Sequence, residues 1–226
     1  MSIQIHPIQM GIAKSYIIQD KGVIMIGDGS PNKIKKFKKG LEKTSIKPEE
    51  IQLIILTHGH FDHAGAAKEL KEMTGAQIVM HYLDKDFLEK GLKNRPPGLT
   101  TWGCFLRHIL NMFYAPFIHF PVANVDVIVG DEGMSLAEYG IRGKILHTPG
   151  HTSGSISVVL ESGDAFVGCL AMNALPLSTK PSLPIFGEDV QALKESWKLV
   201  LAQGAKTIYP AHGESFSAEI VREKFL

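Results

Sequence analysis

The chain has 226 residues, of which 44% are hydrophobic and 21% charged, and its formal net charge is +1. These values are typical of a globular protein, and the length suits one domain spanning residues 1–226. The nearly balanced charge argues against a nucleic-acid-binding protein, and no stretch approaches the ~20 apolar residues of a membrane span.

The two cysteines, Cys104 and Cys169, are too far apart in sequence to suggest the disulfide framework of a small secreted domain. Residues 1–16 contain no apolar stretch that resembles a secretory signal. We therefore expect a reduced, cytoplasmic location.

The chain begins with signals for a hairpin and a helix. Residues 14–19 and 22–26 are strand-like runs that turn near Asp20 and Lys21. The basic run 33–43 has its apolar residues on one side, which predicts an amphipathic surface helix that begins near Asn32.

A strand, a helix and a second strand are expected next. Residues 51–57 form a continuous apolar run, as in a strand that is buried on both faces. A helix should follow over about 63–74, ending at Gly75, and residues 77–81 predict another strand.

Residues 84–122 have a different character, because NRPPG is followed by the apolar and aromatic run WGCFLRHILNMFYAPFIHF. We expect a helical excursion that packs on the domain. Covering a pocket, joining two copies into a homo-oligomer through residues 102–120, and touching a lipid surface are the alternatives. The candidates for substrate contact in this segment are Trp102, Phe105, Phe113 and Tyr114.

The second half is richer in strands. Short β-like runs in 123–160 suggest antiparallel strands, and a hairpin should turn at Ser162–Gly163. A helix over about 188–203, a strand at 207–210 and a short terminal helix complete the chain. This order fits two sheets whose outer faces are covered by helices, in a mixed α/β fold.

Four polar side chains that bind metals well follow the predicted buried strand directly: His58, His60, Asp62 and His63. Ligand sites in α/β folds gather beyond the carboxyl ends of strands. Alternating positions aim His58 and His60 the same way, whereas the adjacent Asp62 and His63 diverge. That divergence favours two metal ions over one.

Two later segments supply further histidines. In HTPGHTSGS, residues 147–155, His151 lies beyond a turn and is free to point into a cleft, while His147 is expected to be a strand-end residue. In YPAHG, residues 209–213, His212 follows a short strand and would be the distant ligand of a second metal.

The segments THGHFDH, HTPGHTSGS and YPAHG, in this order, resemble the metallo-β-lactamase-fold hydrolase superfamily over nearly the whole chain. The resemblance implies a four-layer αββα sandwich of two mixed sheets with helices on their outer faces, and a two-metal site at one edge of the sheets. It implies that His58, His60 and His151 hold the first metal. It assigns Asp62, His63 and His212 to the second.

The chain departs from this family at the position of the metal-bridging aspartate, where it has Cys169. Asp164 is no substitute, because five strand residues place it about 16 Å away. The cysteine resembles the subclass of true metallo-β-lactamases that binds its second metal through sulfur. Met172 stands where that subclass has a lysine, and it is a further candidate for substrate contact. A thiolate ligand favours zinc over calcium, magnesium or manganese.

The resemblance implies a dinuclear zinc hydrolase in which a metal-bridging hydroxide attacks a small ester, thioester or lactone, with β-lactams as a side substrate. Asp62 would orient the hydroxide and move a proton. One alternative is a mononuclear non-haem iron oxygenase that acts on sulfur compounds. The other is a non-catalytic metal-binding protein with a degenerate second site.

Overall fold

A computed structural model describes residues 2–27, 29–92, 97–113, 119–174, 178 and 180–226. The first of two six-stranded sheets has its strands in chain order, with β1 to β3 antiparallel and β3 to β6 parallel. Its strands are β1 (Gln4–Gln9), β2 (Lys14–Gln19), β3 (Val23–Ile26), β4 (Ile51–Ile55), β5 (Gln77–His81) and β6 (Val127–Val129).

The second sheet has the order β12-β11-β10-β9-β8-β7, in which β10 and β11 are parallel and the other pairs are antiparallel. Its strands are β7 (Met134–Ser135), β8 (Gly143–His147), β9 (Ile156–Leu160), β10 (Asp164–Met172), β11 (Thr207–His212) and β12 (Phe216–Ser217). Both sheets are therefore mixed, as predicted.

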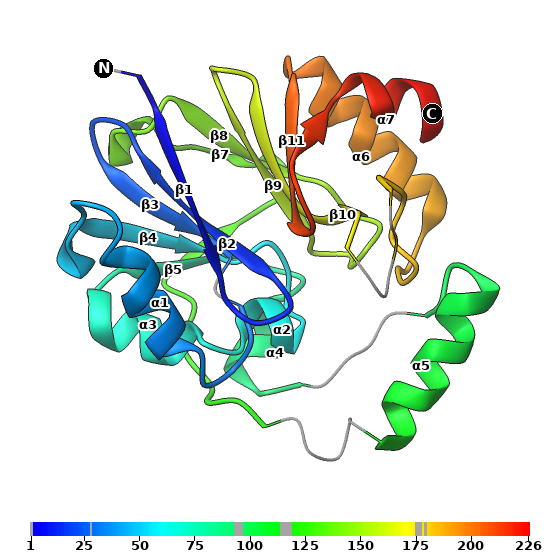
Figure 1. Ribbon diagram of the computed structural model, residues 1–226, viewed down its shortest axis with the longest axis horizontal. Helices are drawn as coiled ribbons and strands as arrows, with labels where there is room; N and C mark the ends of the chain where they lie inside the picture. The colour runs from blue at the N-terminus through cyan, green and yellow to red at the C-terminus, as the bar shows by residue number, and fades with distance from the viewer. Residues whose placement is uncertain (1, 28, 93–96, 114–118, 175–177, 179) are drawn as a thin grey trace.

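Helices cover the outer face of each sheet (Figure 1). The first sheet is covered by α1 (Ile34–Leu41) and α3 (Ala67–Thr74), and the second by α6 (Val190–Ala202) and α7 (Glu219–Lys224). The remaining helices are α2 (Phe61–Ala64), α4 (Lys85–Glu89), α5 (Thr101–Phe113) and the 3₁₀ helices η1 (Pro48–Glu50) and η3 (Ala137–Tyr139). The predicted αββα sandwich is confirmed.

Each boundary between layers is apolar. Between the sheets, Ile24 and Leu53 of the first sheet pack in one cluster with Val158 and Phe166 of the second. Outside them, Phe37 and Trp197 anchor α1 and α6 to their sheets, and both side chains are fully buried. Burying a large apolar side chain stabilises the fold by about 1.5–3 kcal/mol. These contacts therefore hold the two sheets in fixed positions relative to each other.

The helix predicted over 63–74 is two helices, α2 and α3, separated at Gly65. A Cβ at Gly65 would lie 2.3 Å from the Phe61 carbonyl oxygen and 2.4 Å from Pro31 Cδ. The Gly65 N–H donates a hydrogen bond to the Gly29 carbonyl. The crowded loop before α1 therefore breaks the helix. Gly75 does end α3, in the left-handed conformation with φ 73°.

Three strand expectations need correction. The run 127–129, expected among antiparallel strands, is β6 and pairs parallel to β5. Strand β1 lies at a sheet edge and was not expected. His212, expected to follow the strand at 207–210, is the last residue of β11.

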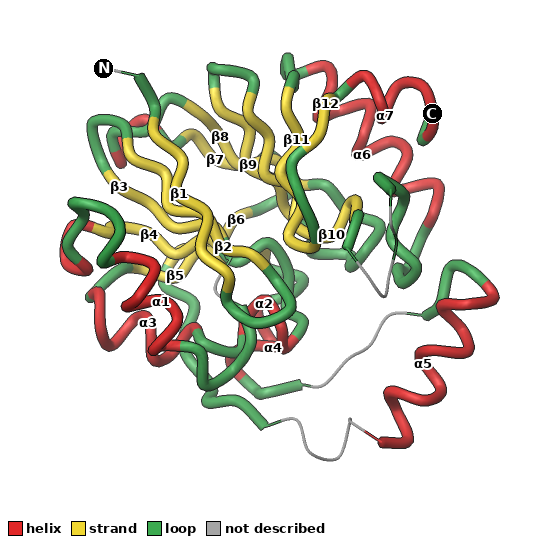
Figure 2. The backbone as a smooth tube through the Cα atoms, in the orientation of Figure 1, coloured by secondary structure: helices red, strands yellow, loops and turns green. Residues whose placement is uncertain are grey.

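The segment 84–122, where a helical excursion packed on the domain was expected, contains α4 and α5, and α5 stands apart from both sheets (Figure 2). Trp102 and Phe105 are 48% and 56% exposed. Tyr114 and the side chain of Phe113 lie outside the described residues. Across the described ranges, none of the helices has the length and apolar character to traverse a lipid bilayer.

Candidate metal centre

The first histidine cluster occupies the loop after β4 and the first turn of α2. The Thr57 carbonyl accepts a hydrogen bond from Ile156 N–H at 2.8 Å, so this loop of the first sheet touches the start of β9 in the second. His58, His60 and His63 are 1%, 8% and 2% exposed. Three imidazoles buried together at the junction of two sheets cannot be surface histidines.

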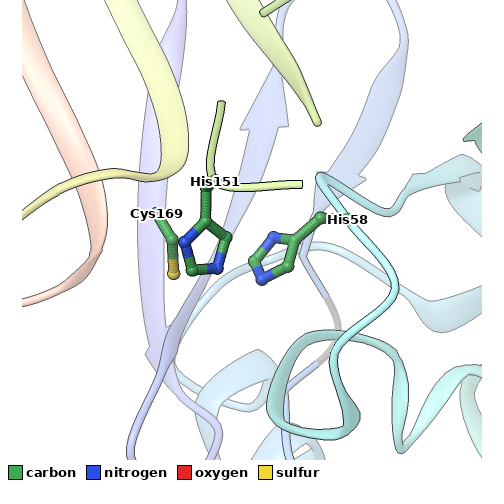
Figure 3. Close-up of side chains that lie close together, drawn as sticks. All are labelled: His58, His151 and Cys169. Carbon is green, nitrogen blue, oxygen red and sulfur yellow. The ribbon is translucent and has the colours of Figure 1, made fainter. Parts of the chain in front are cut away.

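The second sheet supplies the distant residues. His151 lies in the loop after β8, Cys169 within β10 and His212 at the end of β11, and all three are buried. Figure 3 shows His58, His151 and Cys169 pointing toward one another. Parallel pairing of β10 with β11 brings Cys169 and His212 to the same edge.

A bulge aims Cys169 at this edge. The β10–β11 register shifts on both sides of Gly168, which has a φ of 53°. A Cβ at Gly168 would lie 2.7 Å from Thr57 Oγ1. Glycine therefore serves two purposes here, since it permits the left-handed backbone and lets the two sheets approach.

One group of donors is formed by His58, His151 and Cys169, and His60 adjoins it beside His151. Each pair of the three imidazole rings is nearly perpendicular, at 85° to 88°, with centroids 4.6 to 4.8 Å apart. His60 Nδ1 lies 3.1 Å from His151 Nε2. The buried His58 Nε2 has no hydrogen-bond partner among the described residues. Rings in this arrangement direct lone pairs at one point.

The other group is formed by His63, His212, Asp62 and again Cys169. His63 Nε2 lies 3.1 Å from His212 Nε2 and 3.3 Å from Cys169 Sγ. Asp62 Oδ2 lies 3.3 Å from His63 Nε2 and 3.5 Å from His212 Nε2. The Cys169 sulfur therefore belongs to both groups of donors.

Backbone carbonyls set the tautomers of two of these histidines. His151 Nδ1 lies 2.9 Å from the Phe186 carbonyl, and His212 Nδ1 lies 3.1 Å from the Ile12 carbonyl. A carbonyl only accepts, so each Nδ1 carries the proton. Each neutral ring then presents the lone pair of Nε2 to the centre, as metal-binding histidines require.

The residues fit zinc in both spacing and chemistry. Zinc–nitrogen bonds of about 2.0–2.1 Å place two nitrogen ligands of a tetrahedral ion roughly 3.3–3.4 Å apart. The nitrogen and carboxylate separations within the two groups run from 3.1 to 3.5 Å. Imidazole, thiolate and carboxylate are the ligand types that zinc takes in proteins.

Burial and neighbouring charges divide the site electrostatically. Burial lowers the pKa of His58 to about 3 and that of His60 well below its usual range, so both rings are neutral. Burial would also lower the pKa of His63, but Cys169 and Asp62 raise it to about 9. Burial opposes ionisation of the Cys169 thiol, yet His63 and His212 hold its pKa well below normal. Without a metal, protons on His63 and His212 balance the thiolate and the carboxylate.

Zinc binding should therefore release protons. At pH 7, we expect roughly two to leave the side chains, one each from His63 and His212, because a ring that binds metal through Nε2 must lose that proton. The apparent zinc affinity should rise with pH up to about 9, where His63 loses its proton unaided. Titration calorimetry in buffers of different ionisation enthalpy counts these protons. A zinc affinity that is flat between pH 6 and 9 would contradict this charge arrangement.

The other residues singled out in the sequence lie elsewhere. His147 ends β8, and its ring stacks on that of His81 at 4.0 Å and 12°, beside Asp131. Parallel stacked rings cannot both have one cation in their planes, so this arrangement is a packed pair of imidazoles. His147 and Asp131 also line a cavity of about 650 Å³ next to α6 that includes none of the seven predicted ligands among its described lining residues. Met172 is buried beside His212.

Sequence reasoning missed Asp84, a fully buried acid close to this centre. By sequence alone, residue 84 marks only the start of the helical excursion. The signal that points to it is its place three residues after β5, at the edge of the sheet where the histidine loop also emerges.

Comparison with known proteins gives a family match over most of the chain. The model of the metallo-beta-lactamase superfamily matches residues 10–212. A probable metallo-hydrolase of Methanocaldococcus jannaschii is 32% identical over 210 residues, which cover 89% of this chain and 88% of that protein. A hydroxyacylglutathione hydrolase of Pelagibacter ubique is 31% identical over 142 residues, which cover 63% of this chain but only 44% of that protein.

Solved structures support the fold. BLEG-1, a B3 metallo-β-lactamase, has a TM-score of 0.72 at 17% identity, with 98% of this chain and 97% of that chain covered. An archaeal metallo-β-lactamase superfamily protein from Sulfolobus tokodaii has a TM-score of 0.67 at 24% identity, with 97% and 83% covered. At these identities the likeness concerns the fold alone.

Proposed function

This chain belongs to the metallo-β-lactamase superfamily as a metal-dependent hydrolase, and we propose that it is a dinuclear zinc enzyme that cleaves a small ester, thioester or lactone. The proposal depends above all on the two groups of donors that share Cys169. His58, His60 and His151 would hold one ion, and Asp62, His63 and His212 the other. Cys169 would contact at least one of them.

When bound, two zinc ions supply Lewis acidity and lower the pKa of water toward neutrality. The chain's own groups prepare the site for this chemistry. Before metal binds, His58 and His60 are neutral. Asp62 is ionised, because His63 and His212 hold its pKa well below its usual range although burial opposes this. An ionised Asp62 Oδ2 at this position can accept a proton from an attacking water and pass it to the leaving group.

The thioester is the first substrate class to test. The hydroxyacylglutathione hydrolase from Pelagibacter ubique matches this chain over 142 residues, but that alignment covers less than half of that protein. The aligned 142 residues therefore support hydrolysis of a thioester more strongly than they indicate which thiol the substrate carries. Esters and lactones have the same reacting carbonyl, and β-lactams are the amide case.

The helix α5 is the best candidate for a substrate-facing element. At its base, Gly98 bridges to Phe186 and Leu99 N–H donates to the Ile185 carbonyl at 2.8 Å. The Phe186 carbonyl in turn accepts the hydrogen bond from His151. Trp102 and Phe105, whose ring centroids are 5.7 Å apart, are thus on a helix anchored next to a proposed ligand.

Metal analysis is the direct test. We expect zinc near two per chain in the purified protein, loss of hydrolysis after chelation, and recovery on adding zinc. Hydrolysis is measured on a panel of thioesters, esters, lactones and β-lactams, with a His60→Ala variant purified in parallel to expose contaminating activity. One iron per chain with no hydrolysis would favour the oxygenase, and substoichiometric metal would favour a non-catalytic binding protein.

A further inference from the structure

Asp84 lies between the two loops that carry the histidines of the first group. It follows β5 in the first sheet, and its side chain is 0% exposed. Asp84 Oδ2 accepts hydrogen bonds from Gly59 N–H at 2.9 Å and from Thr152 Oγ1 at 2.8 Å. Asp84 Oδ1 accepts one from Gly154 N–H at 3.0 Å. A single carboxylate therefore joins both loops.

Its partners are neighbours of the proposed ligands. Gly59 separates His58 from His60, and Thr152 follows His151. The two loops come from different sheets and meet where His60 Nδ1 lies 3.1 Å from His151 Nε2. A shift of either loop would lengthen the distance between His60 Nδ1 and His151 Nε2. The hydrogen bonds to Asp84 therefore fix the spacing of these two nitrogen atoms.

The local sequence is adapted to this contact. A Cβ at Gly154 would lie 2.5 Å from Asp84 Oδ1, so no larger residue leaves room for the carboxylate. Thr152 Oγ1 also lies 2.8 Å from Ser155 Oγ, and Thr152 N–H donates to that same Ser155 oxygen at 3.0 Å. The His151 loop is therefore tied both to itself and to the first sheet.

Among the described residues, three groups hydrogen-bond to the Asp84 carboxylate and all three are donors, which suits a carboxylate better than an amide of the same size. Burial raises the pKa of Asp84, and the hydrogen bonds from Thr152, Gly59 and Gly154 oppose that rise. An asparagine has one accepting oxygen, so its amide N–H₂ would face at least one of these donors. A buried donor without an acceptor costs about 1–3 kcal/mol.

We propose that Asp84 is a positioning residue that holds the His58–His60 loop and the His151 loop in the spacing that the first metal requires. In the described part of the chain, its carboxylate bonds to Gly59, Thr152 and Gly154 and to none of the proposed metal ligands. This inference rests on the proposed metal centre, and it assigns a role to a buried acid that the proposed chemistry leaves unused.

The test compares zinc affinities of the full chain and of single variants by competition with a chromogenic chelator. Asp84→Asn should lower zinc affinity by about 10- to 100-fold, the usual effect of losing a group that orients metal ligands. The matched control is Asp86→Asn, which removes a half-exposed carboxylate two residues away on α4 that pairs with Lys90 and should leave zinc affinity unchanged. The cobalt-loaded Asp84→Asn protein should also show an altered ligand-field spectrum.

Thr152 provides a gentler pair of variants if Asp84→Asn fails to fold. Thr152→Val removes one hydrogen bond to Asp84 and should weaken zinc binding, whereas Thr152→Ser keeps the hydroxyl and should restore it. The inference is overturned if Asp84→Asn or Thr152→Val lowers the melting temperature of the metal-free chain without changing zinc affinity or the cobalt spectrum. If the wild-type chain itself binds no zinc, the proposed function fails instead.

Discussion

Replacing Asp62 by alanine is expected to lower kcat/KM by about 10²- to 10⁴-fold, the contribution of a well-placed general acid–base group. Asp62 Oδ2 lies within 3.5 Å of both His63 Nε2 and His212 Nε2, so it is placed both to bind the second metal and to take a proton. In the metal-free chain, His63 and His212 hold the pKa of Asp62 well below its usual range, so the carboxylate is already ionised before metal binds. The loss should appear mainly in kcat, measured on the best substrate of the panel with zinc in excess.

His147→Ala is the matched control for that experiment, because it also removes a polar side chain near the sheet edge. His147 Nε2 lies 2.8 Å from the Ser153 carbonyl oxygen. The His147 ring stacks on the His81 ring, outside the two groups of proposed metal ligands. We expect a far smaller loss of activity than for Asp62→Ala. Comparable losses in the two variants, with both proteins folded by circular dichroism, would show that the choice of His151 over His147 as a metal ligand is wrong.

Much of the fold could be predicted because its strands and turns have strong local signals. Strand β4 is an uninterrupted apolar run, and it is buried in a parallel part of its sheet. Gly75 and Gly163 mark a helix end and a hairpin, and both have a positive φ. The first histidine segment could be found because side chains that bind metal well and pack badly into a core directly follow a buried strand.

The errors occur where contacts distant in sequence decide the structure. Strand β1 contains Pro7, which weakens a strand signal, and it forms by pairing with β2 at a sheet edge. The break at Gly65 comes from packing against Pro31, which no helix pattern contains. Aspartate usually lies on the surface, so the residue type alone does not single out Asp84. Only its hydrogen bonds to Gly59, Thr152 and Gly154 distinguish it from the other aspartates of the sequence.

Cys169→Ser is expected to weaken zinc binding by more than about 10- to 100-fold, the effect of losing a group that only orients ligands, because Cys169 is itself a proposed ligand. Cys169 Sγ lies 3.3 Å from His63 Nε2 and belongs to both groups of donors. A serine hydroxyl is a poor zinc ligand at neutral pH and cannot replace the anionic sulfur. Zinc content after dialysis and competition with a chelator measure the loss.

Cobalt loading makes the role of the sulfur directly visible, since a thiolate bound to cobalt gives a charge-transfer band that Cys169→Ser must abolish. Cys169→Asp is the informative second variant, because it replaces the soft thiolate by a carboxylate, which is also anionic but is a hard ligand. It should retain two metals but lose preference for soft ions such as cadmium. The thiolate also raises the pKa of His63, so Cys169→Ser should release fewer protons on zinc binding. An unchanged cobalt spectrum and zinc affinity in Cys169→Ser would reduce Cys169 to a small buried side chain and leave the site with nitrogen and oxygen ligands alone.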